Sequence, residues 1–115
     1  MKTIKLTNDM KLKNRNEDLK NAIACNDFDF LKRNKHKYDI NHRFSEEDND
    51  TLLLYSISDK GSSTYKFFLE NGADISFVND EGESIIHSIV YSGLSERLVD
   101  IFENPFFTPF FLLTA

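Results

Sequence analysis

The sequence predicts an all-α fold of stacked helix-turn-helix units, and two observations lead to it. A stretch at 51–75 aligns with a second stretch at 84–102. The offset between them, 84 − 51 = 33, places Thr51 on Ser84, and self-similarity at a fixed period is typical of repeat proteins. The chain of 115 residues contains only 4 Gly and 2 Pro, which favours helices over a turn-rich β fold. The helices of such a unit are short, and short helices are only marginally stable when isolated. We therefore expect neighbouring units to stack through their apolar sides.

The first unit is expected to follow a loose, basic N-terminal arm at residues 1–14. Asn16-Glu17-Asp18 provide a cap and an acidic first turn, which suit the positive end of a helix dipole. The buried side of this helix is predicted to carry Leu19, Ala22, Ile23 and Cys25. Cys25 is therefore expected to be a packed thiol. A second helix follows, and the basic run 32–37 is predicted to be its solvated end, with a weak separate contact as the alternative.

The second unit is expected to begin with an acidic loop at 42–50. Thr51 is a suitable N-cap for a short helix. After a turn at 60–63, a second helix places apolar residues at helical spacing, namely Tyr65, Phe68 and Leu69. Asn71-Gly72 predicts a left-handed helix stop, because glycine has no Cβ to clash there.

The third unit repeats this order. An acidic loop ends near Gly82, which permits a tight reversal, and Ser84 caps the next helix. Ser92-Gly93 breaks that helix. The last helix carries the stripe Leu98, Ile101 and Phe102, and Pro105 ends it.

This unit resembles the ankyrin repeat. The match is carried in the middle copy by Asn71-Gly72-Ala73-Asp74-Ile75 and in the third copy by Gly82, Ser84, Ile86, His87, Val90 and Gly93. The resemblance implies an ankyrin-repeat solenoid at 15–104, with repeats at about 16–43, 44–76 and 77–104. No Pro follows Thr51 or Ser84, and only the third copy keeps the family's His, as His87. We therefore expect modest stability.

The apolar stretch at 105–115 does not fit the period. Thr108-Pro109 resembles the opening of a fourth copy, but its offset from Ser84 is only 108 − 84 = 24. Three interpretations stay open: a capping helix over the third repeat, an exposed partner-docking patch, and an incomplete fourth repeat.

The motifs of the common enzyme classes are absent from the sequence. There is no phosphate-binding Gly loop, no nucleophile elbow and no zinc-protease helix, so we expect no catalysis and no cofactor. His36 and His42 lack a convergent Cys, which argues against metal binding. A lone cysteine suits a reducing compartment, and neither a signal peptide nor an apolar run of about 18 residues is present. These features predict a cytoplasmic protein without membrane contact.

Charge is divided unevenly between the two parts of the chain. Residues 1–37 hold ten Lys/Arg and five Asp/Glu, whereas 38–115 hold four and fourteen. In ankyrin domains the loop tips and first helices form a concave binding surface. The resemblance carries that role to Glu47, Asp48, Asp50, Ser58, Asp59, Asp80, Glu81, Glu83, Tyr91 and Ser92.

This acidic surface predicts the kind of partner. It favours a basic protein, with Tyr91 as an aromatic anchor, and disfavours nucleic acid because phosphates would be repelled. No small-molecule ligand is expected. The predicted function is a non-catalytic protein-protein interaction module, either an inhibitor or immunity protein, or an effector or scaffold that recruits a host protein. The alternative for the acidic residues is a solvated rim.

Overall fold

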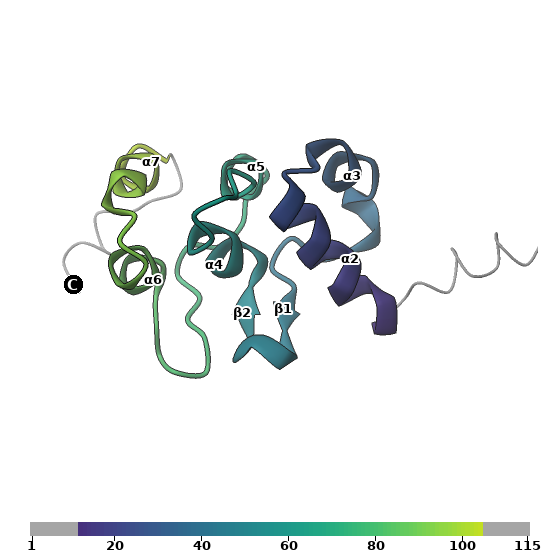
Figure 1. Ribbon diagram of the computed structural model, residues 1–115, viewed down its shortest axis with the longest axis horizontal. Helices are drawn as coiled ribbons and strands as arrows, with labels where there is room; N and C mark the ends of the chain where they lie inside the picture. The colour runs from purple at the N-terminus through teal and green to yellow at the C-terminus, as the bar shows by residue number, and fades with distance from the viewer. Residues whose placement is uncertain (1–11, 105–115) are drawn as a thin grey trace, which may run out of the picture.

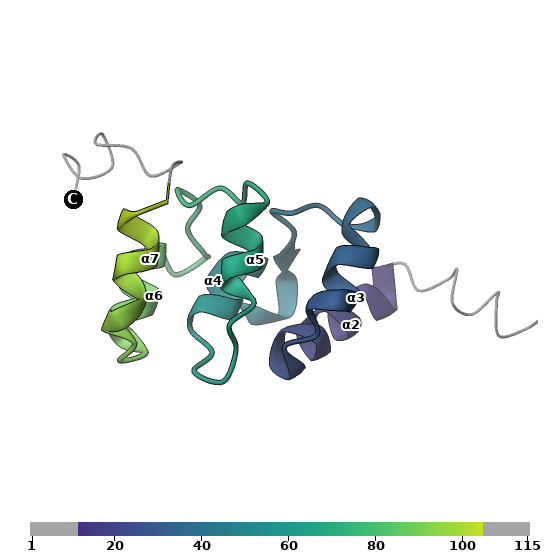
Figure 2. The same cartoon turned by 90° about the horizontal axis from the view of Figure 1, so that it is seen from above.

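The computed structural model describes residues 12–104, with side chains from residue 15 onward. In this part the chain forms three successive helix pairs (Figure 1). The pairs are α2 (Leu12–Cys25) with α3 (Phe28–Arg33), α4 (Leu52–Ile57) with α5 (Tyr65–Glu70), and α6 (Ile85–Tyr91) with α7 (Leu98–Phe102). The first helices of the pairs form one row and the second helices form another beside it (Figures 1 and 2). No helix within 12–104 is long and apolar enough to cross a membrane.

Local signals in the sequence start and stop these helices. Thr51 accepts the backbone N–H of Leu54 through its hydroxyl at 3.1 Å, as the N-cap prediction required. Ser84 forms a capping box with His87, whose ring Nδ1 accepts the N–H of Ser84 at 3.3 Å. The predicted stop after α5 is confirmed, because Gly72 has a φ of 84°.

The core runs along the interior of the row. Helix α4 contacts α5 and α6, so its apolar side chains are buried on several sides. Residues that are fully buried include Ile23, Leu31, Leu52, Ile57, Phe68, Ile85, Ile89 and Ile101. Apolar contact between units therefore supplies stability that helices of five to seven residues lack.

The predicted loop at 42–50 contains more order than expected. Strands β1 (Arg43–Phe44) and β2 (Asp50–Thr51) pair antiparallel, with the 3₁₀ helix η2 (Ser45–Glu47) between them. There are two other 3₁₀ turns in the described part: η1 (Lys35–Lys37) follows α3, and η3 (Ser95–Arg97) precedes α7. Phe44 anchors the hairpin, because its ring is fully buried and lies edge-on to Tyr55 at 5.0 Å between ring centroids.

Two predictions about the first unit were wrong. Helix α2 begins at Leu12, so the expected arm at 1–14 overlaps it and Asn16 lies inside the helix. Cys25 is exposed. It lies six residues after Leu19, which at 100° per residue places it about 120° around the helix from that buried side chain. The predictions for residues 1–11 and 105–115 lie outside the described residues.

Candidate functional site: an acidic edge formed by two loops

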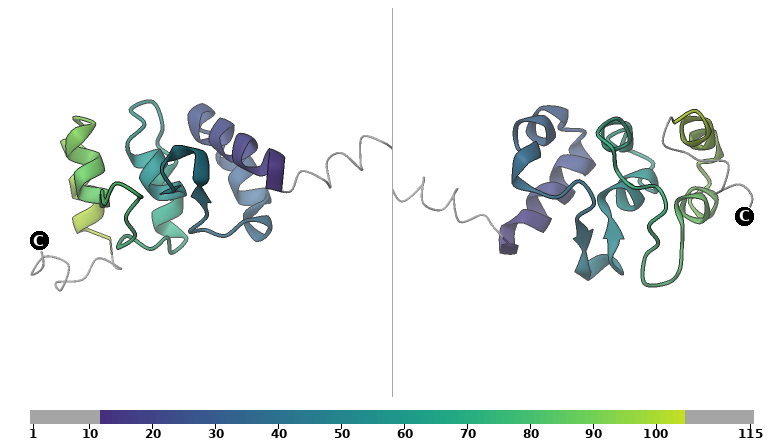
Figure 3. Two further views of the ribbon diagram at one scale, coloured as in Figure 1. Left: turned by 90° about the horizontal axis from the view of Figure 1, so that it is seen from below. Right: turned by 180° about the vertical axis from the view of Figure 1, so that it is seen from behind.

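Two loops from successive units project from the same side of the helices and contact each other (Figures 1 and 3). One is the β1–β2 hairpin, and the other is the segment 76–83 between α5 and α6. The backbone N–H of Asp80 donates to the carbonyl of Asp48 at 2.8 Å. The side-chain amide of Asn49 donates to the Asp80 carboxylate at 2.9 Å. The tips of the two loops are therefore held together by both backbone and side chain.

Asn79 organises the second loop from within. Its side chain is buried, and its carbonyl oxygen accepts the backbone N–H groups of Glu81 and Glu83, both at 2.9 Å. Its amide nitrogen donates to the carboxylates of Asp50 at 3.0 Å and Glu83 at 2.9 Å. Every polar atom of this amide therefore has a partner, which fixes the loop backbone and holds one carboxylate from each loop.

Arg43 joins the same two loops on the β1 side. Its guanidinium donates to the carbonyl of Asn49 at 2.9 Å and to that of Val78 at 2.8 Å. It also lies 5.0 Å from the ring centroid of Phe77. The five donors of a guanidinium allow one side chain to bind carbonyls from two chain segments, so Arg43 adds a further link between the two loops.

Carboxylates gather where the loops meet. We call this surface the acidic edge and define it by Glu46, Glu47, Asp48, Asp50, Asp80, Glu81 and Glu83. Burial raises the pKa of Asp50, the hydrogen bond from Asn79 opposes this rise, and the negative charges of Glu83, Asp48 and Glu47 add to it. The neighbouring negative charges contribute to this shift, and a cationic ligand at the edge would oppose it.

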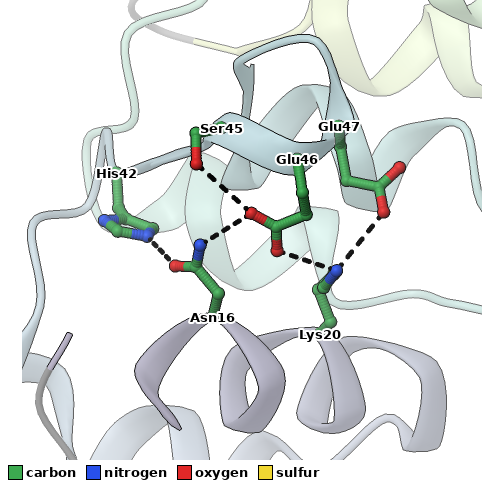
Figure 4. A network of polar contacts seen from close by, with 6 residues as sticks. All are labelled: Asn16, Lys20, His42, Ser45, Glu46 and Glu47. Atoms are coloured by element: carbon green, nitrogen blue, oxygen red, sulfur yellow. Dashed lines mark hydrogen bonds and ion pairs between the residues drawn. The ribbon is translucent and has the colours of Figure 1, made fainter. Parts of the chain in front are cut away.

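The hairpin is also attached to α2 by a polar network (Figure 4). The Lys20 ammonium lies 2.8 Å from Glu46 and 3.3 Å from Glu47. Asn16 donates to the Glu46 carboxylate at 2.9 Å through its amide nitrogen. The ion pair with Lys20 lowers the pKa of Glu46. Lys20 of the first unit thus compensates part of the negative charge of the acidic edge, at Glu46 and Glu47. The rest of that charge includes Asp48, Asp80 and Glu81 in the two loop tips.

His42 completes this network. Its Nε2 lies 2.6 Å from the amide oxygen of Asn16. That oxygen is an acceptor, because the amide nitrogen of Asn16 is directed at Glu46, so Nε2 carries the proton and donates. Burial lowers the pKa of His42, and the positive charge of Arg15 adds to the effect. Through its bond to Asn16, the His42 ring links the hairpin to α2.

The structure divides the ten predicted site residues into two groups. Glu47, Asp48, Asp50, Asp80, Glu81 and Glu83 belong to the acidic edge. The other four follow or end the first helices: Ser58 and Asp59 after α4, and Tyr91 and Ser92 at the end of α6. Since α4 has six residues, about 9 Å of helix at 1.5 Å per residue separates its two ends.

The helix-end group differs from the edge in chemistry. The Ser58 hydroxyl donates to the carbonyls of Leu54 and Tyr55, both at 3.1 Å, and Asp59 accepts from the backbone of Gly61. These contacts belong to the end of α4. Tyr91 is 74% exposed and stacks on His87 with 6.4 Å between ring centroids. Within this group, the tyrosine is the side chain that presents an aromatic surface to solvent.

Comparison with known proteins provides no match that could explain the site. No family model, curated protein or solved structure matches the chain. Within residues 12–104, no three His, Cys, Asp or Glu side chains are arranged to hold a metal ion.

Sequence reasoning missed the residues that hold the edge in place. They are Asn16, Lys20, Arg43 and Asn79. A register signal was available for the loops, since Asn49 and Gly82 are separated by one repeat period, 82 − 49 = 33, and both have positive φ, 57° and 75°. Nothing in the local sequence shows that Lys20 faces the hairpin, because that contact depends on how α2 packs.

Proposed function

We propose that the chain is a non-catalytic protein-protein interaction module of the ankyrin type, which binds a basic protein through its acidic edge. Support for the repeat comes from contacts that recur in register. Thr51 and Ser84 cap α4 and α6 from equivalent positions, one repeat period apart. The backbone N–H of Asp74 donates to the Asn41 side chain at 2.8 Å, again across one period.

One observation carries the proposed binding role: the tips of two successive loops are hydrogen-bonded to each other. The Asp80–Asp48 backbone bond orders the two loop tips, and Asn79 holds the carboxylates of Asp50 and Glu83 before any partner arrives. Preorganised groups lose little freedom on binding, which improves affinity. A surface of one charge sign also accelerates encounter with an oppositely charged protein.

The biological role within this proposal has two forms. An inhibitor or immunity protein would block a basic toxin or nuclease, whereas an effector or scaffold would recruit a host protein. Both act without cofactor or nucleic acid, and both fit the cytoplasmic location that the sequence predicts. The inhibitor is preferred, because a small preordered anionic surface suits the masking of one basic site.

Charge reversal tests the proposal. Partners captured from cell extract by the wild-type chain are compared with those captured by an Asp80→Lys, Glu81→Lys variant. The matched control, Glu70→Lys with Glu103→Lys, changes the same net charge at exposed positions away from the edge. We expect the control to retain basic partners, and the edge variant to lose them, with binding weakened by salt. If both variants retain the same partners, the acidic edge is not the binding site.

A further inference from the structure

Two exposed aromatic side chains stack on each other along α6, next to the acidic edge. The rings of His87 and Tyr91 lie 6.4 Å apart between centroids, with 29° between their planes. The two residues are four apart, so they share one side of the helix. In the capping box the His87 Nδ1 accepts the backbone N–H of Ser84, which fixes the orientation of the imidazole ring. We name His87 and Tyr91 the aromatic pair, and its position is set before any partner binds.

The end of α6 lies beside the end of α4. Arg97, in the segment that follows α6, donates to the carbonyls of Ser56 and Ile57 at 3.3 and 3.0 Å. These carbonyls belong to the last turn of α4, and Asp59 follows directly after its C-cap. The two helices also contact each other. Tyr91 and Asp59 therefore lie at the same end of the row of first helices.

Negative charge extends along α4 between the acidic edge and Asp59. Tyr55 lies within this helix and is partly buried. Burial raises the pKa of the Tyr55 hydroxyl, and the negative charges of Glu47, Asp59 and Asp50 add to the rise. The positive charge of Lys20 opposes it. Carboxylates from both ends of α4 thus act on one hydroxyl group, and the aromatic pair stands beside this negative surface.

We propose that the partner of the acidic edge is recognised through an arginine, whose guanidinium stacks on the aromatic pair while a second cation of the same segment pairs with the edge. This inference rests on the proposed function and names the side chain that the partner must present. A guanidinium is planar and weakly hydrated, so it stacks on aromatic rings, whereas an ammonium is a compact and strongly hydrated charge. The aromatic pair therefore selects arginine over lysine.

The length of α6 sets the spacing between the two cations. Glu83 of the acidic edge directly precedes the N-cap Ser84, and Tyr91 is the last residue of the helix. The helix has seven residues, which is about 10 Å at 1.5 Å per residue. A polyproline-II segment rises about 3.1 Å per residue and has three residues per turn. Side chains three positions apart in such a segment point to one side and span about 9 Å, so this spacing fits the surface.

Two peptides test the assignment on the full-length chain. One has Arg at every third position, separated by Gly and Ser, and the other has Lys in place of every Arg. Fluorescence anisotropy of the labelled peptides at low salt gives the ratio of their Kd values. We expect the Arg peptide to bind more tightly, and Tyr91→Leu to reduce this preference about 2- to 5-fold, the size of an exposed cation–π contact. Tyr91→Phe retains the ring and is the matched control, which should keep the preference.

The possible results separate this inference from the proposed function. If Tyr91→Leu binds both peptides with an unchanged preference, the arginine assignment is overturned and the acidic edge remains the binding site. If the Asp80→Lys, Glu81→Lys variant binds both peptides as tightly as wild type, the proposed function is overturned. Failure of both peptides to bind the wild-type chain would overturn both. Far-UV circular dichroism verifies that Tyr91→Leu stays folded, which we expect because this side chain is 74% exposed.

Discussion

Arg97 holds its guanidinium carbon 4.5 Å from the ring centroid of Tyr65, so a cation of the third unit stacks on an aromatic ring of the second. The Arg97 side chain is buried and donates to the carbonyls of Ser56, Ile57, Lys60 and Ser62 at 2.8–3.3 Å. These are the carbonyls at the end of α4 and in the following turn, where a helix has no internal donors. The Tyr65 hydroxyl donates to Asp100 at 2.5 Å, which joins the two units a second time.

Replacing Arg97 should therefore loosen the junction between the second and third units. We expect Arg97→Met to lower the free energy of unfolding by about 3 kcal/mol, because buried carbonyls lose charged donors. Arg97→Lys should recover only part of the loss, since an ammonium cannot reproduce the planar fork. Urea denaturation measures both. Arg33→Met, at an exposed arginine paired with Asp29, is the control, and an equal loss there would contradict this role.

Asn79→Ala should destabilise the acidic edge. The variant removes the donor to Asp50 and the acceptor of two backbone N–H groups, which we expect to cost about 2 kcal/mol. Hydrogen exchange at Glu81 and Glu83 should accelerate more than exchange in α2. Equal acceleration in both places would mean that the substitution lowers global stability and has no particular effect on the loop.

Asn79→Asp separates hydrogen bonding from charge at the same position. It retains the acceptor oxygen but places a carboxylate against Asp50 and Glu83. Repulsion raises the pKa of the new carboxyl in the folded chain, so the folded state binds more protons and stability falls as pH rises. Relative to Asn79→Ala, the free energy of unfolding of Asn79→Asp should therefore decrease from pH 4 to pH 7. A difference that does not change with pH would show that the carboxylates are too far apart to interact.

His42 should make stability fall under mildly acidic conditions. Burial lowers its pKa in the folded state below the ordinary 6.5, so between these values the unfolded chain binds the extra proton. The stabilisation is fully present above pH 6.5 and is lost as pH falls through the folded pKa. His42→Gln keeps a donor toward Asn16 but does not titrate. Urea unfolding from pH 7 to pH 5 should show a smaller decline in this variant, whereas His36→Gln should behave as wild type.

The two N-cap residues, Thr51 and Ser84, should contribute independently to the free energy of unfolding. Thr51→Ala and Ser84→Ala are each expected to lower stability by about 1 kcal/mol, because a backbone N–H at the helix start loses its acceptor. Thr51→Ser should restore most of the loss. The sites lie in successive units, so thermal unfolding of the double variant tests additivity. A Thr51→Ala variant as stable as wild type would mean that water replaces the hydroxyl.

Local signals were sufficient for the starts of α4 and α6 and for the stop after α5, but they failed at α2, where the expected cap Asn16 lies inside the helix. Thr51, Ser84 and Gly72 act within three or four residues of their own positions, so their roles follow from sequence alone. The acidic loops were also identified from sequence. Their contact with each other depends on a bond between Asp48 and Asp80, which are far apart along the chain, and no local pattern encodes it.

The sequence-based prediction failed mainly to identify the buried polar side chains. Arg97 and Asn79 are of residue types that are usually exposed, so composition gives no reason to place them inside. The repeat register does hold a hint for Arg97, because it aligns with Thr64, which is fully buried. Cys25 shows the opposite error: a residue type that is usually buried stands on the outer side of α2.

The hydrogen bond between Asp80 and Asp48 joins main chain to main chain. Exchanging either side chain therefore leaves the donor N–H and the acceptor carbonyl present. The spacing of the two tips therefore depends on their side chains only in part, through the bond from Asn49 to Asp80. New side chains at these positions would alter which molecules are recognised while the frame that presents them persists. A scaffold of this kind can acquire a different specificity through a few surface changes, without refolding its interior.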